Sequence, residues 1–232
     1  MSEFVDVTEH GRVLEVRIDS GKGNPISFEV LAAFDEVLDT FEKSESHGSL
    51  VISGQPGIFS GGFDLAVMRG ENIDEVIRLV GLGGRLVHRI FSGHKPSVAA
   101  VTGHAVAAGA LLALGTDSRI GASDARMGLP EVALGMVLPD WAQILAEARL
   151  NPSHLQQATA TSRMYEGADN VAAGFLDEIV PADQVVERAL MEGERLADLS
   201  PRAYIGHMER HRRPLSDAMA KAIDVEMAAA GS

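Results

Sequence analysis

The sequence predicts an α/β fold made of one core domain and a helical C-terminal region. Short apolar runs of strand length alternate with amphipathic runs of helical length along the chain. The 232 residues suffice for one large core, and 46% of them are apolar. No segment rich in Pro, Gly or Ser divides the chain. We therefore place the core domain at residues 1–195 and the helical region at residues 196–232.

The first half of the chain alternates strand and helix signals. Residues 14–18 alternate apolar and polar side chains, which predicts a half-buried strand. Ser27 can cap a helix, and apolar residues then recur at helical spacing from Phe28 to Phe41. Further on we expect a strand at 49–53, a turn at 54–57 and a helix over 68–92.

The second half begins with the longest apolar run, residues 97–114. Gly103, His104 and Gly109 interrupt this run, so we expect a buried strand at 98–101 and a buried helix at 105–115 rather than a membrane span. The remaining expected elements are a strand at 119–122, helices at 141–150, 154–161 and 168–174, a strand at 175–180, a helix over 181–199, and a last helical region after Pro201 that ends in a small-residue tail at 228–232.

Composition excludes several classes of function. The formal charge of -13 argues against a nucleic-acid partner. The chain has no cysteine, so disulfides, thiol nucleophiles and thiolate metal sites are excluded. The 8 histidines show no ligand spacing, and we expect no metal site. Residues 1–6 lack the basic and apolar regions of a signal peptide, so we expect a cytoplasmic protein that is not attached to a membrane.

Two blocks of small residues can present backbone N–H groups to a ligand. Gly61 and Gly62 let the chain turn tightly and present the N–H of Phe63. Residues 107–109 follow a strand and open a helix, whose first N–H groups are free and lie at the positive end of its dipole. Fixed N–H donors in a pocket that contains little water stabilise an oxyanion such as the enolate of a thioester. A third block, residues 128–131, ends in Glu131.

These three blocks, in this order, resemble the crotonase (enoyl-CoA hydratase/isomerase) superfamily over about residues 10 to 200. The resemblance implies a spiral of β-β-α turns with a helical C-terminal trimerisation region, assembled as a homotrimer or hexamer. It implies an acyl-CoA substrate and no cofactor beyond the CoA that the substrate carries. It also implies that Phe63 and Ala108 provide the N–H donors of the oxyanion hole, and that Glu131 is the catalytic acid and base. The family usually has glycines at positions 107 and 108, and alanine keeps the N–H while leaving less room for the acyl group.

The reaction depends on Leu111, which stands where the hydratases carry a second glutamate. Hydration needs one group to activate water and another to manage the second proton, whereas moving a double bond from C3 to C2 needs only one base. The chain is most similar to the Δ3,Δ2-enoyl-CoA isomerases (dodecenoyl-CoA isomerases), which share the leucine, the single glutamate and a tryptophan just after a proline, here Trp141. The resemblance thus implies isomerisation of 3-enoyl-CoA to 2-trans-enoyl-CoA in fatty acid β-oxidation, with Leu111, Trp141 and Gly62 lining the substrate pocket.

Two other functions remain open. Another crotonase reaction, such as enoyl-CoA hydration or thioester hydrolysis, would need a water-activating group, for which Asp140 and His104 are the candidates. A non-catalytic acyl-CoA-binding protein would keep the oxyanion hole and not depend on Glu131. Trp141 suits either a core anchor or a wall of the acyl pocket. The basic cluster of the C-terminal region suits either a solvated helix face or a contact with CoA phosphates, and it comprises His207, Arg210, His211, Arg212 and Arg213.

Overall fold

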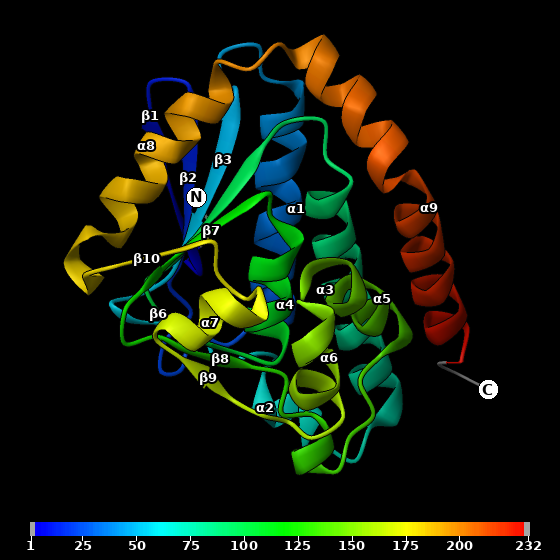
Figure 1. The fold of residues 1–232 in the computed structure, drawn as a ribbon. Helices are drawn as coiled ribbons and strands as arrows, with labels where there is room; N and C mark the ends of the chain where they lie inside the picture. The colour runs from blue at the N-terminus through cyan, green and yellow to red at the C-terminus, as the bar shows by residue number, and fades with distance from the viewer. Residues whose placement is uncertain (1–2, 230–232) are drawn as a thin grey trace.

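The computed structural model describes residues 3–229 and places their strands in two sheets (Figure 1). The larger sheet has the order β1 (Val5–His10), β2 (Val13–Ile18), β3 (Ser49–Ser53), β5 (Ser97–Val101), β7 (Ser118–Ala122) and β10 (Glu178–Val180). Only the β1–β2 pair of this sheet is antiparallel. The smaller sheet has the order β4 (Gly57–Ser60), β6 (Gly103–Val106), β8 (Arg126–Gly128) and β9 (Tyr165–Glu166), with β9 antiparallel to β8.

The chain builds both sheets at once by repeating a strand–strand–helix unit. In each of the pairs β3–β4, β5–β6 and β7–β8, the first strand joins the larger sheet and the second joins the smaller one. A helical segment then returns the chain to the start of the next pair. This is the β-β-α spiral that the family resemblance implies, so the expected fold class is confirmed, and a C-terminal helix follows it.

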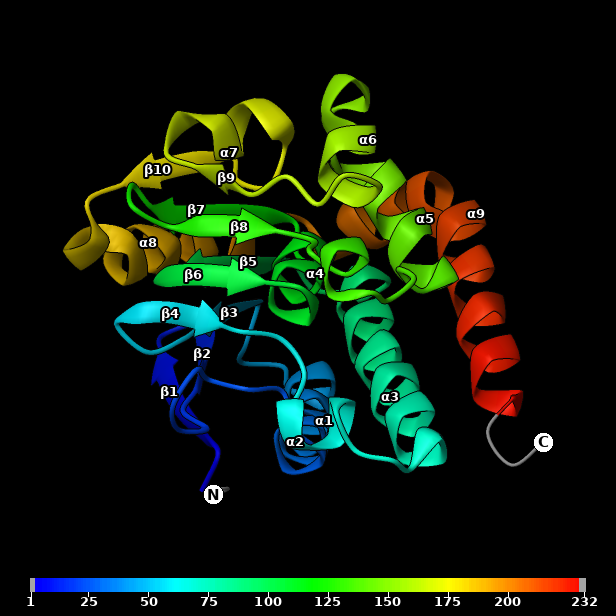
Figure 2. The same cartoon turned by 90° about the horizontal axis from the view of Figure 1, so that it is seen from below.

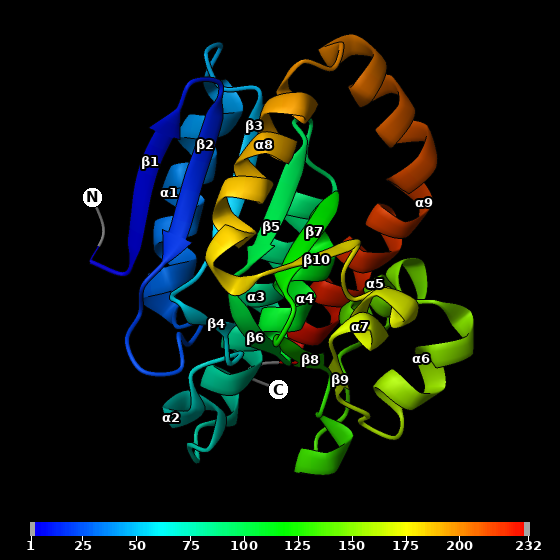
Figure 3. The ribbon, with the colours of Figure 1, turned by 60° about the vertical axis from the view of Figure 1, so that its left-hand side comes forward.

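Helices cover both faces of the larger sheet (Figure 3). Helix α8 (Val185–Ala197) packs on one face, and α1 (Phe28–Lys43), α3 (Ile73–Phe91) and α4 (Ala108–Gly115) lie on the other. The apolar core fills the space between these layers. The other helical elements are α2 (Leu65–Met68), α5 (Asp140–Arg149), α6 (Pro152–Thr159), α7 (Ala168–Ala173), α9 (Pro201–Ala228) and the short 3₁₀ turns η1 (Val132–Leu134) and η2 (Ala182–Gln184).

The last helix, α9, folds back on α3 and α5 of its own chain (Figures 1 and 2). Glycines on α3 make this close approach possible. A Cβ atom at Gly81 would lie 2.3 Å from Met227 Cγ, and one at Gly84 would lie 2.9 Å from Trp141 Cε2. These glycines weaken α3 by intrinsic propensity, but they let α9 and Trp141 pack directly against its backbone.

Several expected boundaries are wrong. The helix over 68–92 begins only at Ile73, because Met68 ends the separate helix α2 and Asn72 caps α3. The helix over 105–115 begins only at Ala108, since β6 runs to Val106. The strand at 175–180 begins only at Glu178, because the N–H groups of residues 175 and 176 donate to Asn170 O instead of a ladder. Strands β1, β4, β6, β8 and β9 were not expected.

Some expectations concern the ends of the chain or the membrane. Residues 1–2 of the N-terminal hexapeptide and residues 230–232 of the small-residue tail lie outside the described residues. Within the described part, none of the helices combines the length and apolar character that crossing a membrane requires.

Candidate functional site

Three neighbouring parallel strands bring the predicted site residues to one edge of the smaller sheet. Strand β6 pairs with β4 on one side and with β8 on the other. Figure 2 shows these three strands pointing the same way, toward α4. Phe63 follows β4 by three residues, Ala108 follows β6 by two, and Glu131 follows β8 by three. Because the carboxyl ends of adjacent parallel strands meet at one edge, the fold gathers residues from three separate segments.

The turn after β4 leaves the Phe63 N–H outside the local ladder. Phe63 forms a parallel bridge with Ile26, in which the Ile26 N–H donates to Gly62 O (2.8 Å) and the Asp64 N–H donates to Ile26 O (3.1 Å). Gly62 has φ +102°, a conformation that L side chains rarely adopt. A Cβ there would also lie 3.1 Å from Ala107 Cβ and 3.4 Å from Ala108 N. Glycine at position 62 therefore lets the two donor segments touch.

The second donor segment opens α4. Ala107 has φ 52° and ψ -124°, and its N–H donates to Gly128 O at the end of β8 (3.0 Å). Ala108 is the first residue of α4, so its N–H has no acceptor within the helix. A Cβ at Gly109 would lie only 2.3 Å from Ser60 O, which shows how closely α4 approaches the end of β4. The Ala108 N–H thus lies at the positive end of a fully buried helix.

An apolar wall closes the space beside both donor residues. A cavity of about 10 Å³ is lined by Phe63, Ala108 and Trp141 together with aliphatic side chains and Gly83. Trp141 is completely buried, and its indole N–H meets no acceptor in the described part of the chain. Leu111, one turn into α4, is only 2% exposed and belongs to the core. Sequence reasoning did not identify Leu112, which also lines this cavity.

Glu131 is a buried carboxyl that forms no ion pair with any of residues 3–229. Its side chain stands at the start of η1 and is 7% exposed, and Oε2 has no hydrogen-bond partner among residues 3–229. Burial raises the pKa of Glu131 from its ordinary value of 4.5 to about 7, against a smaller lowering effect of its own backbone N–H. A carboxyl that titrates near neutral pH can both take and return a proton, which suits a general acid and base.

The other acid–base candidates, His104 and Asp140, are exposed and hydrogen-bond to other segments. His104 is exposed on β6, where its Nδ1 accepts a hydrogen bond from the Arg126 N–H (3.1 Å). Asp140 is an exposed residue at the first position of α5, and its N–H donates to Glu226 Oε1 on α9 (2.8 Å). Within residues 3–229, no three His, Asp or Glu side chains gather closely enough to hold a metal ion.

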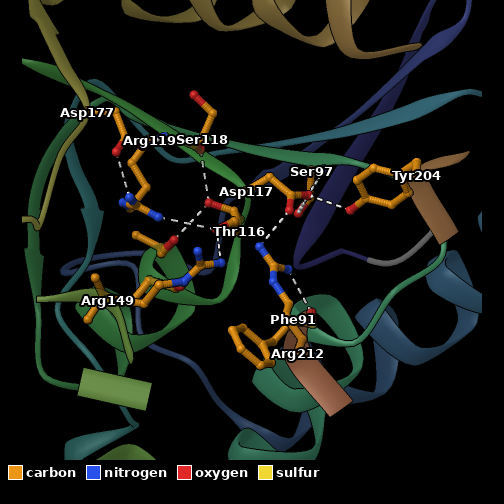
Figure 4. A network of polar contacts seen from close by, with 12 residues as sticks. Phe91, Ser97, Thr116, Asp117, Ser118, Arg119, Arg149, Asp177, Tyr204 and Arg212 are labelled. Carbon is orange, nitrogen blue, oxygen red and sulfur yellow. Dashed lines mark hydrogen bonds and ion pairs between the residues drawn. The ribbon is translucent and has the colours of Figure 1, made fainter. Parts of the chain in front are cut away.

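A buried polar network contains one member of the basic cluster (Figure 4). Arg212 donates from Nη2 to Asp117 Oδ1 and from Nη1 to Phe91 O, both at 2.7 Å. Asp117 Oδ2 accepts hydrogen bonds from the Ser97 N–H (2.7 Å) and the Tyr204 hydroxyl (3.0 Å). Arg212 therefore joins α9 to the end of α3, which contradicts both expectations for this residue. The four other residues of the basic cluster are exposed, as a solvated face requires.

The same network provides hydrogen-bond donors to the carbonyl groups at the C-terminal end of α4, the helix that begins at Ala108. Arg149 donates to Leu114 O (3.0 Å) and Thr116 O (2.7 Å), and Arg119 donates to Thr116 O (3.3 Å). Burial, followed by repulsion from the neighbouring guanidinium groups, lowers the pKa of Arg149 to about 9. Cations at a helix C-terminus stabilise the helix dipole, so these arginines anchor the end of α4 opposite the donor.

Replacing Arg212 tests this reassignment. We expect Arg212→Met to lower the free energy of unfolding by about 3–5 kcal/mol, because it leaves Asp117 buried without its cation. The adjacent Arg213→Met is the matched control. It removes only an exposed contact with Glu209 at 3.6 Å and should change stability by less than about 0.5 kcal/mol. Chemical denaturation measures both changes, and equal stabilities would contradict the buried pairing.

The chain is similar to several known proteins over nearly its whole length. A family model described as enoyl-CoA hydratase/isomerase matches residues 8–231. The carnitinyl-CoA dehydratase of Salmonella typhi is 30% identical over 215 residues, which cover 91% of this chain and 81% of that protein. An apo enoyl-CoA isomerase of Mycobacterium tuberculosis superposes with a TM-score of 0.93 at 34% identity, over 99% of this chain and 100% of that one.

A further solved structure differs in the reaction that its name states. An enoyl-CoA hydratase of Mycobacterium marinum superposes with a TM-score of 0.92 at 34% identity, over 98% of this chain and all of that one. The names of these similar proteins therefore include an isomerase, a hydratase and a dehydratase. The choice among reactions has to come from the residues of the site.

Proposed function

The chain belongs to the enoyl-CoA hydratase/isomerase family, and we propose that it moves the double bond of a 3-enoyl-CoA thioester to give the 2-trans-enoyl-CoA. The observation that carries this proposal is a buried carboxyl, Glu131, whose Oε2 has no hydrogen-bond partner in the described part of the chain, combined with an apolar Leu111. A second acid is absent at the position where a hydratase of this family carries one. This reaction belongs to the degradation of unsaturated fatty acids.

The proposed reaction is a proton transfer from C2 to C4. The thioester oxygen accepts hydrogen bonds from the N–H groups of Phe63 and Ala108. The Glu131 carboxylate removes a proton from C2, and the electron pair of that C–H bond spreads over the dienolate, with negative charge on the oxygen between the two donors. The protonated Glu131 then returns the proton to C4, which leaves the double bond between C2 and C3. One carboxyl therefore acts first as base and then as acid.

Hydration lacks a second group at this site. It would need another acid or base to hold a water molecule beside Glu131. Leu111 can neither hydrogen-bond nor polarise water, and its side chain is part of the apolar core. His104 and Asp140 are exposed and hydrogen-bond to other segments. The site therefore favours isomerisation over hydration or thioester hydrolysis.

The family resemblance also supports proposals about cofactors and assembly. We propose that no cofactor is needed beyond the CoA of the substrate. We also propose that the protein is cytoplasmic and that it assembles as a homotrimer or hexamer. Sedimentation equilibrium distinguishes a monomer of 24.6 kDa from either assembly.

A turnover assay with two substrates tests the proposed function. Purified protein is mixed with 3-hexenoyl-CoA, and the conjugated 2-enoyl thioester is followed by its ultraviolet absorbance. Hydration of crotonyl-CoA is measured in parallel. We expect isomerisation without hydration. Faster hydration than isomerisation would support the hydratase alternative, and tight binding without either reaction would support an acyl-CoA-binding protein.

The pH dependence of this activity follows from Glu131. Its carboxyl must be ionised to act as the base, and its pKa is raised to about 7 by burial. We therefore expect kcat/KM to fall about tenfold for each pH unit below about 7, because the ionised fraction falls by that factor. A pH–rate profile between pH 5 and pH 8 measures it. A flat profile down to pH 5 would show that the base has an ordinary carboxyl pKa or is another group.

A further inference from the structure

We propose that Asn24 is a positioning residue that fixes the oxyanion donor at Phe63. Asn24 lies in the loop between β2 and α1, where the sequence predicts neither a helix nor a strand. Its proposed role is to hold the backbone that directs the Phe63 N–H, without contacting the substrate itself. This inference rests on the proposed function, because it assigns a ligand oxygen to that N–H.

The amide of Asn24 is completely buried and fully used. Its Nδ2 donates to Ile18 O at the end of β2 (3.0 Å) and to Phe59 O on β4 (2.8 Å). Its Oδ1 accepts hydrogen bonds from the Ser20 N–H (2.9 Å) and the Ser20 hydroxyl (3.3 Å). One side chain therefore ties its own loop to two strands, and β4 is the strand that leads into the donor turn.

The backbone on both sides of Asn24 holds the donor turn directly. Backbone hydrogen bonds connect residues 23–26 with residues 61–64, on both sides of Phe63. They join the Gly61 N–H to Gly23 O (2.8 Å), the Ile26 N–H to Gly62 O (2.8 Å) and the Asp64 N–H to Ile26 O (3.1 Å). Because the peptide groups flanking Phe63 are fixed to this loop, the direction of the Phe63 N–H depends on where the loop lies.

The backbone of Asn24 is in a conformation that needs support. Its φ is 49°, in the left-handed region that non-glycine residues occupy at a cost in free energy. Such a residue persists only where its surroundings fix it, and here the four hydrogen bonds of its amide do so. Without the amide, the loop can relax, and the Phe63 N–H loses its alignment with the thioester oxygen.

Asn24→Gly is the sharpest test, since glycine tolerates the left-handed backbone and removes only the amide. We expect the C2 proton exchange of a CoA thioester in D₂O, and isomerisation, to fall roughly 10- to 100-fold, because misaligning one oxyanion donor approaches the effect of removing it. The affinity for hexanoyl-CoA should stay nearly unchanged. Asn170→Ala is the matched control, since Asn170 is equally buried and its Nδ2 ties α7 to the turn between β7 and β8 through Ala125 O (2.9 Å).

The outcomes separate this inference from the proposed function. Proton exchange by the wild-type protein without isomerisation would refute the proposed function and leave Asn24 testable by exchange. No exchange by the wild-type protein would overturn both. Equal losses in Asn24→Gly and Asn170→Ala, or a parallel loss of hexanoyl-CoA binding, would show that Asn24 has only a structural role.

A second variant keeps the inference testable if Asn24→Gly does not fold. Ser20→Ala removes the hydroxyl that donates to Asn24 Oδ1 and to Pro25 O (2.7 Å), at a half-buried position. We expect its exchange rate to fall about fivefold, as the loss of about one hydrogen bond to the loop implies. An unchanged rate in folded Ser20→Ala would then overturn the role of this loop.

Discussion

The Glu131→Gln protein should lose isomerase activity by a factor of roughly 10² to 10⁴ while it still binds CoA thioesters. Glutamine has the shape of the protonated carboxyl but can neither accept the C2 proton nor return it. The oxyanion donors come from the backbone of Phe63 and Ala108, so the substitution does not change them. Turnover of 3-hexenoyl-CoA measures the activity, and calorimetric titration with hexanoyl-CoA measures the binding. Unchanged turnover would refute the assignment of the base.

Stability provides the control for Glu131→Gln. Folding raises the pKa of Glu131, so the protonated carboxyl stabilises the folded state relative to the ionised one. This contribution to the free energy of unfolding is lost as the pH rises through about 7. Glutamine avoids the burial of a charge. We therefore expect the free energy of unfolding of the variant to exceed that of the wild type by about 1–3 kcal/mol at pH 8. Near pH 4.5 the two values should differ little. A less stable variant would mean that its loss of activity reflects unfolding.

The second large effect is a gain of function from Leu111→Glu. This substitution places a second carboxyl one turn into α4, at the position where the hydratases of the family carry one. A paired carboxyl can hold and activate water beside Glu131, so we expect measurable hydration of crotonyl-CoA, an activity that the wild-type protein should lack. Isomerisation should fall, because water then reaches the dienolate. Hydration is followed by the loss of the conjugated absorbance of crotonyl-CoA.

Leu111→Gln is the matched variant for this experiment. Both substitutions bury a polar group in the core and should lower the free energy of unfolding by about 2–5 kcal/mol. Only the glutamate supplies a base, so only the Leu111→Glu protein should hydrate crotonyl-CoA. A folded Leu111→Glu protein without hydration would contradict the argument that the number of carboxyls selects the reaction.

The two expected donor segments could be predicted from local sequence because each has a local cause, whereas the role of Glu131 came from the family resemblance. The glycines at 61 and 62 indicate a tight turn, and the small residues at 107–109 indicate a helix start close to other backbone. Both segments follow strands of the smaller sheet that were not expected, and the parallel pairing of these strands brings the segments to the same sheet edge as Glu131. The structure finds Phe63, Ala108 and Glu131 at adjoining strand ends and Leu111 in the core.

The parts that sequence could not predict depend on contacts between distant segments. Asn24 hydrogen-bonds to Phe59, 35 residues away, and nothing in the loop sequence shows that partner. Arg212 belongs to a run of basic residues typical of a solvated face, and only the approach of Asp117, 95 residues away, buries it. The boundary between β6 and α4 was missed because Ala107 adopts a positive φ without being glycine. An unbroken apolar run therefore concealed the end of the strand.

The central claim is that one carboxyl carries the proton from C2 to C4. The most direct test uses 3-hexenoyl-CoA with deuterium at both C2 positions, converted in a single turnover in ordinary water. Because Glu131 is only 7% exposed, it should deliver part of the deuterium to C4 before exchange with water. The account predicts product molecules that carry deuterium at C4, detected by mass spectrometry and NMR. Product whose C4 hydrogen comes only from solvent would contradict the single-carboxyl shuttle.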